Sequence, residues 1–278
     1  MKIKNSLANK RNLKNFILNN FNLLILFSEL GLYLFIIFVI ISMILYPDGA
    51  VPLGEISSHY NFWWNYLSDL GMTKSFLGNP KIGSTIFFIL SIISLSFSGI
   101  ILNLMNLINI WSILNLKFSS EFISNGKIRN SKFKILYASI SGIFSSVFAI
   151  LIAIFPKDTN LYEHQIIAGL FFLGISIQIF LYSTLLFLIK RIIGKILLKK
   201  LNINYNQINY KFNILGMFIS SVLFLVVLGL YSILPILIPE LGKISSPFEP
   251  IMQKISIIIL IINIYLQIRL NKNYKLLN

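Results

Sequence analysis

Two histidines and two aspartates are the side chains of this protein that are best suited to acid–base or metal chemistry. His59 and Asp69 lie in the segment 47–81, whereas Asp158 and His164 lie in the segment 156–164. Imidazole and carboxylate groups can bind a divalent metal such as zinc, for which His59 and His164 are the candidate ligands. Without a metal, either histidine could act as a general base that an aspartate orients. We favour a third interpretation, a hydrogen-bonded network that joins the two loops. The sequence spacing does not indicate that these four side chains converge at one metal or catalytic site.

The segment 57–70 contains neither Gly nor Pro, and Ser57 or Ser58 could cap a helix there. Such a helix would carry aromatic side chains on one face and asparagine, serine and aspartate side chains largely on another. An aromatic amphipathic helix beside a membrane usually lies in the interface, so we expect a lid that covers one end of the protein. The candidate ligand-binding residues of this lid are Trp63, Asn65, Tyr66, Ser68 and Asp69.

Six apolar stretches must position these residues. They cover about 23–46, 82–110, 133–155, 164–189, 212–238 and 251–270, and each is long enough to cross a hydrocarbon core of roughly 30 Å as a helix. Of the 278 residues, 56% are hydrophobic and only 12% are charged, whereas about a quarter of a soluble domain is charged. We therefore predict an all-α, polytopic membrane protein with six transmembrane helices in one bundle. A basic extension over 1–21 precedes the bundle, and a tail over 272–278 follows it.

The basic residues are distributed unequally between the two sides of this predicted bundle. Nineteen of the 24 Lys and Arg fall at the termini and in every second loop, whereas the other three loops hold five Lys, seven of the nine Asp and Glu, and both His. The positive-inside rule then places both termini in the cytoplasm and the candidate residues on the outer face of a cell membrane. The central polar residues, among them Asn103, Gln178 and Asn263, are uncharged, whereas a channel or ion-coupled carrier usually places an ionisable residue near the midplane.

The net charge of +15 is explained by this topology rather than by nucleic acid, because no detached basic domain or nucleic-acid motif is present. After the fourth span, Lys190, Arg191, Lys195, Lys199 and Lys200 recur at helical spacing. This pattern predicts a helix that continues past the bilayer and could attract anionic head groups on the cytoplasmic side. The alternative is the ordinary basic flank of a membrane span, which we favour. Because the chain lacks cysteine and the common metal, phosphate-loop and nucleophile motifs, the sequence requires no cofactor.

The most specific string is NYLSDLG at 65–71. Together with Asn79, with Phe155 and Pro156, and with His164, it resembles the prokaryotic membrane family catalogued as domain of unknown function 998. Members of that family are six-helix proteins with an SDLG loop after the first span and an FP…H loop after the third. The resemblance covers most of the chain, although the N-terminal extension and the loop 190–211 are longer here. It implies the topology and brings no activity with it.

Two further comparisons are more distant. The six-span plan is similar to that of Frag1/DRAM/Sfk1-like membrane proteins, some of which are linked to lipid remodelling. Ceramidase-like hydrolases hold zinc with three histidines, and this chain has only two. From the uncharged interior and the aromatic, acidic outer loops, we expect a protein that binds or organises lipid at the outer leaflet. The alternatives are a membrane-embedded enzyme that acts on a lipid or isoprenoid head group, with or without the help of a metal, and a small-molecule carrier.

Overall fold

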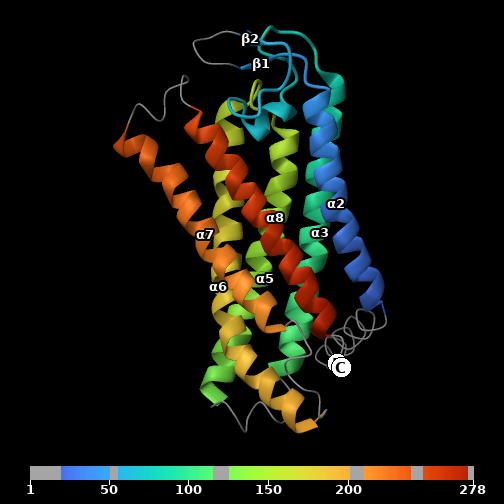
Figure 1. Cartoon of the computed structure of the whole chain (residues 1–278), viewed down its shortest axis with the longest axis vertical. Helices are drawn as coiled ribbons and strands as arrows, with labels where there is room; N and C mark the ends of the chain where they lie inside the picture. Colours follow the sequence, from blue (N-terminus) through green and yellow to red (C-terminus); the bar gives the residue numbers. More distant parts are fainter. Residues whose placement is uncertain (1–19, 51–55, 115–124, 201–209, 239–246, 275–278) are drawn as a thin grey trace, which may run out of the picture.

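The computed structural model describes residues 20–50, 56–114, 125–200, 210–238 and 247–274, and within them the chain is a bundle of long helices (Figure 1). All six are long and apolar enough to cross a membrane, which confirms the predicted all-α architecture of a multi-pass membrane protein. The predicted extension over 1–21 and the tail over 272–278 lie mostly outside the described residues. The helices are α2 (Phe21–Ile44), α3 (Ile82–Leu114), α5 (Asn125–Ile154), α6 (Leu161–Lys200), α7 (Tyr210–Leu237) and α8 (Phe248–Tyr274).

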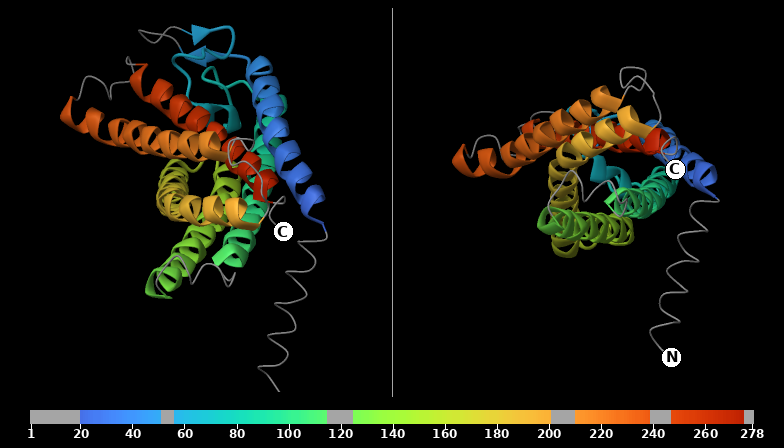
Figure 2. Two further views of the ribbon diagram at one scale, coloured as in Figure 1. Left: turned by 60° about the horizontal axis from the view of Figure 1, so that its bottom comes forward. Right: turned by 90° about the horizontal axis from the view of Figure 1, so that it is seen from below.

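Neighbouring helices pair as antiparallel hairpins, α2 with α3, α5 with α6, and α7 with α8. Helix α3 also packs on α5, and α8 packs on α2 and α3, so α3 and α8 lie at the centre of the arrangement. The interface between α6 and α7 is much smaller than those within the hairpins. Figure 1 shows the reason, because the upper end of α7 leans away from the rest of the bundle. The two further views in Figure 2 show the same divergence.

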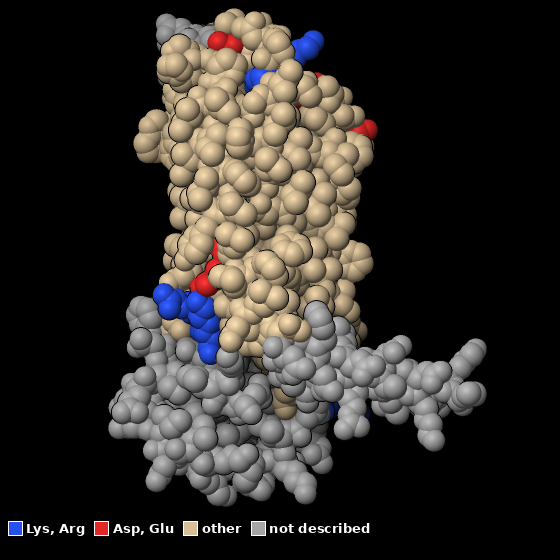
Figure 3. Space-filling model, turned by 90° about the vertical axis from the view of Figure 1, so that its right-hand side faces the viewer, with Lys and Arg blue, Asp and Glu red and all other residues tan. Residues whose placement is uncertain are grey.

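The surface between the two ends of the bundle is apolar. Figure 3 shows one face on which the coloured charged side chains gather at the two ends and leave a broad uncharged band between them. Many leucine, isoleucine and phenylalanine side chains of the long helices are exposed, for example Leu26, Phe97 and Phe144. A soluble protein rarely exposes so large an apolar area, whereas a bilayer covers it.

The interior of the bundle is joined by hydrogen-bonded amide side chains. On α3, Asn106 donates to Gln267 of α8 at 2.7 Å, and Asn271 of α8 donates back to the side-chain oxygen of Asn106 at 2.6 Å. Gln267 also donates to Asn263 at 2.8 Å, and Asn109 donates to Asn271 at 2.7 Å. Each of these side-chain amides is buried between helices and away from water, where an unpaired polar group would be costly. This amide ladder, formed by residues 106, 109, 263, 267 and 271, therefore fixes α3 against α8.

Two of the central polar residues pair with each other outside the amide ladder. Gln178 of α6 donates to the side-chain oxygen of Asn103 of α3 at 3.0 Å. The cavity beside them has a volume of only about 20 Å³, which is close to the space of a single water molecule. The carrier hypothesis expects an open path lined by Asn103, Gln178 and Asn263, and the part of the chain that the structure describes fills this space with paired side chains.

The longest loop is folded against one end of the bundle, which we call the loop end and which the sequence predicts to be the outer one. It contains a short antiparallel ribbon of β1 (Gly49–Ala50) and β2 (Ile56–Ser57) and a 3-10 helix, η2 (Leu67–Gly71). Gly49 is required in this ribbon, because a Cβ atom there would lie 2.1 Å from the backbone oxygen of His59.

The prediction of an amphipathic helix over 57–70 is wrong, because only the last turn of this segment is helical.

The helix of the fourth predicted span continues through the basic segment, as expected. Helix α6 runs from Leu161 to Lys200 without interruption and is 40 residues long. At 1.5 Å per residue it is about 60 Å long, roughly twice the hydrocarbon thickness. The backbone prediction for the basic segment is therefore confirmed.

Candidate functional site

Asparagine side chains explain why the segment before η2 forms turns instead of a helix. The side-chain oxygen of Asn61 accepts a hydrogen bond from the amide of Trp63 at 3.1 Å. The side-chain oxygen of Asn65 accepts one from the amide of Asn61 at 2.9 Å. Such local bonds compete with the helical hydrogen-bond pattern. As a result Trp63 is exposed, whereas Asn65 is completely buried, which differs from the aromatic and polar faces expected of a helix.

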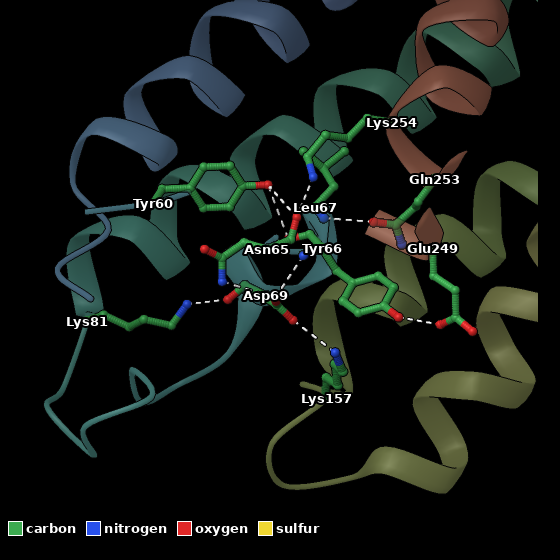
Figure 4. Close-up of polar contacts among 10 residues, drawn as sticks. All are labelled: Tyr60, Asn65, Tyr66, Leu67, Asp69, Lys81, Lys157, Glu249, Gln253 and Lys254. Carbon is green, nitrogen blue, oxygen red and sulfur yellow. Dashed lines mark hydrogen bonds and ion pairs between the residues drawn. The ribbon is translucent and has the colours of Figure 1, made fainter. Parts of the chain in front are cut away.

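Asp69 is the centre of the loop end and is only 1% exposed. One carboxylate oxygen accepts hydrogen bonds from the amide of Tyr66 at 2.8 Å and from the side chain of Asn65 at 3.4 Å. The other forms an ion pair with Lys157 at 2.9 Å, a residue of the loop between α5 and α6. The carboxylate therefore both starts the 3-10 helix and ties one loop to another (Figure 4).

Two further lysines, Lys81 and Lys254, are buried around the same loop. Lys81, directly before α3, donates to the backbone oxygen of Asp69, and Lys254 of α8 donates to the backbone oxygen of Asn65. Both are less than 5% exposed, which is rare for lysine unless the ammonium is paired. In Figure 4 they approach the loop from different helices. Lys157 thus pairs with the Asp69 carboxylate, Lys81 bonds the backbone of Asp69, and Lys254 bonds the backbone of the same loop at Asn65. We call these four residues, Asp69, Lys81, Lys157 and Lys254, the charge cluster.

Burial shifts the titration of the groups in this region. Burial lowers the pKa of Lys81 to about 7, although the attraction of Asp69 and Asp158 opposes the shift. Burial also raises the pKa values of Tyr46 and Tyr60, and the charge of Asp69 raises them further. These tyrosines therefore stay neutral at all physiological pH values.

Helix α8 contacts the same loop through two side chains at its beginning. Tyr66 donates a hydrogen bond from its hydroxyl to Glu249, and burial followed by this bond raises the pKa of Tyr66. Gln253 accepts a hydrogen bond from the amide of Leu67 at 2.7 Å. The ring of Tyr66 also lies under the ammonium of Lys157, which is 4.1 Å from the ring centre. Tyr66 therefore lies between a cation and an anion (Figure 4).

Asp158 joins the same two loops at a different point. Its carboxylate accepts hydrogen bonds from the amide and hydroxyl of Thr73, at 2.9 and 2.7 Å, and from the amide of Lys74 at 3.1 Å. Partial burial alone would raise the pKa of Asp158, but these hydrogen bonds outweigh it and lower the pKa. The network interpretation of Asp69 and Asp158 agrees with these contacts, since both bind the loop 47–81 to the loop 156–164.

A pocket of about 500 Å³ lies beside this network. Its walls come from α6, α7, α8 and η2, in the space where α7 leans away from α6. Leu161 and Leu173 of α6 line the pocket and are more than half exposed, so the pocket opens on the side of the bundle. The polar wall residues near the loop end include Tyr66, Ser68, Lys157, His164, Gln165, Tyr231, Ser232, Glu249 and Gln253. We call this space the lateral pocket.

An apolar pocket of about 60 Å³ lies next to the lateral pocket. The two share Ser68, His164, Ala168, Phe172 and Gln253 as wall residues. The remaining walls of the smaller pocket are apolar side chains of the bundle core under η2. The lateral pocket therefore adjoins a smaller space whose unshared walls are all apolar.

His164 is the one of the four candidate residues that lines the lateral pocket. Its Nδ1 atom lies 2.8 Å from the backbone oxygen of Phe155. Because a carbonyl can only accept, Nδ1 carries the proton and Nε2 of the neutral ring is a hydrogen-bond acceptor. No hydrogen bond joins Ser68 and His164 among the described contacts.

The structure does not unite the four residues that sequence reasoning grouped. His59 follows β2 and is exposed, and its backbone amide bonds the hydroxyl of Ser57 at 3.3 Å. Asp69 and Asp158 hold loops, and His164 lines the pocket. Within the described ranges, which include all four, no group of three or more His, Asp or Glu is placed to hold a metal ion.

The predicted ligand-binding residues are also divided. Tyr66 and Ser68 line the lateral pocket, whereas Asn65 and Asp69 are buried behind it and Trp63 points to the surroundings. Sequence reasoning missed Lys157, Glu249 and Gln253 as pocket residues. The sequence did mark the three lysines of the charge cluster as unusual. Lys81, Lys157 and Lys254 lie on the predicted outer side, where the positive-inside rule disfavours lysine.

Comparison with protein-family models, with curated proteins and with solved structures finds no match to this chain. The resemblance to the family of domain of unknown function 998 therefore stays a prediction.

Proposed function

We propose that this protein resides in the cell membrane with its loop end outward and binds a lipid of the outer leaflet in the lateral pocket. The observation that carries the proposal is the order of the pocket walls along α6. After Leu161, the walls on α6 carry His164 and Gln165 near the loop end and then Ala168, Gly169, Phe172 and Leu173. The hydroxyl of Ser176, at the deepest position, is bonded to the backbone oxygen of Phe172 within its own helix. A lipid has the same order, with a polar head at the membrane surface and chains toward the midplane.

The depth of the lateral pocket supports the same proposal. Its walls on α6 extend from Leu161 to Ser176, which at 1.5 Å per residue is about 22 Å. One leaflet of the hydrocarbon core is roughly 15 Å thick. A head group at the polar end would therefore have room for a good part of an acyl chain, and the opening between α6 and α7 allows entry from the bilayer.

Filling the pocket tests the proposal. A Cβ atom on Gly169 would meet no other atom within 4 Å, so Gly169→Phe can place a ring in the pocket without a backbone clash. Gly229 of α7 has equally open surroundings but does not line the pocket, so Gly229→Phe is the matched control. Lipid that co-purifies in mild detergent is measured by native mass spectrometry. We expect Gly169→Phe to lose most of the bound lipid and Gly229→Phe to keep it.

Two results would count against lipid binding at this site. One is a wild-type protein that carries only the bulk lipid composition, with no stoichiometric lipid. The other is equal lipid retention by Gly169→Phe and by Gly229→Phe. Thermal unfolding of both variants in the same detergent shows whether either substitution has damaged the fold.

A second candidate function, an enzyme that acts on a lipid head group, is favoured by one observation. His164 lines the pocket beside Ser68, and its bond to Phe155 leaves Nε2 free to accept a proton. In this case His164 would act as a general base on a hydroxyl or water at the head group. Release of a water-soluble head group from vesicles, absent with His164→Gln, would support it, and lipid that stays intact with the wild-type protein would exclude it.

A further inference from the structure

The lateral pocket contains two charged wall residues of opposite sign, Lys157 and Glu249. They lie on different elements, the α5–α6 loop and the first turn of α8, and the ring of Tyr66 lies between them (Figure 4). An anionic lipid would meet one favourable charge and one unfavourable charge here. The two opposite charges therefore indicate which kind of head group the pocket would prefer.

The Lys157 side of the pocket has an excess of positive charge. Lys157 is 30% exposed, and its ammonium forms an ion pair with the carboxylate of Asp69. Lys81 and Lys254 both interact electrostatically with Asp69. Lys157 is also a wall residue of the pocket, so its partly exposed ammonium can attract a further anion such as a phosphate.

The Glu249 side of the pocket is suited to a cation. One oxygen of Glu249 accepts the hydroxyl of Tyr66, and Tyr231 of α7 is close enough to interact electrostatically with the carboxylate. All three residues line the pocket. A carboxylate beside aromatic rings is a frequent arrangement for binding an ammonium group, which gains both an ion pair and cation–π attraction.

We propose that the lateral pocket selects a zwitterionic aminophospholipid, with its phosphate at Lys157 and its ammonium at Glu249, Tyr66 and Tyr231. This inference rests on the proposed function, since it assigns a head group to the same pocket. His164 contributes a hydrogen-bond acceptor for a donor of the head group. The acyl chains extend along Ala168, Gly169 and Phe172, away from the charged residues.

The test is a competition between two phospholipids with identical acyl chains, one with a phosphoethanolamine and one with a phosphoglycerol head group. The protein is reconstituted in an equimolar mixture and re-extracted, and bound lipid is counted by native mass spectrometry. We expect the wild-type protein to retain the ethanolamine lipid in excess. Glu249→Gln keeps an acceptor for Tyr66 but removes the charge, so the preference should fall about fivefold, the effect of a partly exposed ion pair.

Glu163→Gln is the matched control, because Glu163 lies in the first turn of α6 at the same end of the bundle, is exposed and does not line the pocket. Its lipid preference should equal that of the wild-type protein. Lys157→Gln should lower the retention of both lipids, since both contain a phosphate. An unchanged preference in Glu249→Gln, or equal effects of Glu249→Gln and Glu163→Gln, would overturn the inference.

Two more arms separate this inference from its alternatives. If Gly169→Phe loses lipid while Glu249→Gln leaves the preference unchanged, lipid binding stands and the head-group assignment fails. If Gly169→Phe retains all lipid, both proposals fail together. Soluble phosphoethanolamine and inorganic phosphate at millimolar concentration should not displace the lipid, and displacement by either would show a site for a free phosphate compound instead.

Discussion

Replacement of Asp69 by asparagine removes a buried carboxylate around which three lysines gather. Asparagine has nearly the same shape and still offers an acceptor to the amide of Tyr66, so the change isolates the charge. Leaving a buried charge without its partner costs about 3–5 kcal/mol of stability. Lys157 is 30% exposed and is partly solvated, which reduces its contribution. We therefore expect Asp69→Asn to lower the free energy of unfolding by about 3 kcal/mol, at the lower end of that range.

The pH dependence of this loss provides a sharper check. The pKa of Lys81 is about 7 because of burial, and the attraction of Asp69 keeps it from falling further. At pH 6 the ammonium is charged and needs the carboxylate, whereas at pH 9 the amine is mostly neutral and does not. The cost of Asp69→Asn should accordingly be greater at pH 6 than at pH 9.

Equilibrium unfolding in mixed micelles of dodecyl sulfate and a mild detergent measures this difference. Asp158→Asn is the matched control, because Asp158 also joins the two loops but is exposed and accepts its hydrogen bonds from Thr73 and Lys74. We expect it to cost about 1 kcal/mol, as for a hydrogen-bonded surface carboxylate. If Asp69→Asn costs no more than Asp158→Asn at pH 6, the charge cluster does not stabilise the loop end as argued here.

Three other substitutions examine separate parts of the structure. Between pH 7 and 10.5 the stability of the wild-type protein should rise with pH, because the unfolded chain still binds a proton at Lys81 that the folded chain has released. Lys81→Met should flatten this rise. An unchanged profile in pH-dependent unfolding would contradict the lowered pKa of Lys81. Gln267→Leu removes partners from two amides of the ladder and should cost about 1–2 kcal/mol, whereas Gln165→Leu on the exposed face of α6 should cost almost nothing in the same unfolding assay. Gly49→Ala places a methyl group against the backbone oxygen of His59 and should open the ribbon, which faster proteolysis of the loop would reveal, with no effect on helix content by circular dichroism.

The helices could be predicted from the sequence because hydropathy and length are enough to define a membrane span. The loop end could not, since the decisive interactions are local side-chain bonds that hydropathy does not register. The Asn61 and Asn65 side chains bind nearby amides, and this outweighs the helical preference that the lack of Gly and Pro in 57–70 indicated. A careful count of asparagine in this segment could have favoured turns.

Only part of the candidate site could be predicted. Asp69, Tyr66, Ser68 and His164 were identified from their chemistry, but their roles depend on partners from distant elements. Asp69 was grouped with histidines, whereas the structure pairs it with Lys157, 88 residues later. The lateral pocket depends on the lean of α7, a property of the whole bundle that no local pattern encodes.

The amide ladder also has a consequence for the order in which the protein is made. Asn106 of α3 leaves the ribosome 161 residues before Gln267 of α8, its hydrogen-bonding partner. During that interval the side-chain nitrogens of Asn106 and Asn109 lack their acceptors on α8, whereas the side-chain oxygen of Asn106 can already accept the hydroxyl of Tyr182 of α6. Insertion of α8 therefore completes the hydrogen bonds of these two α3 amides, and a chain that stopped before Phe248 would leave both nitrogens without the acceptors that the folded protein provides.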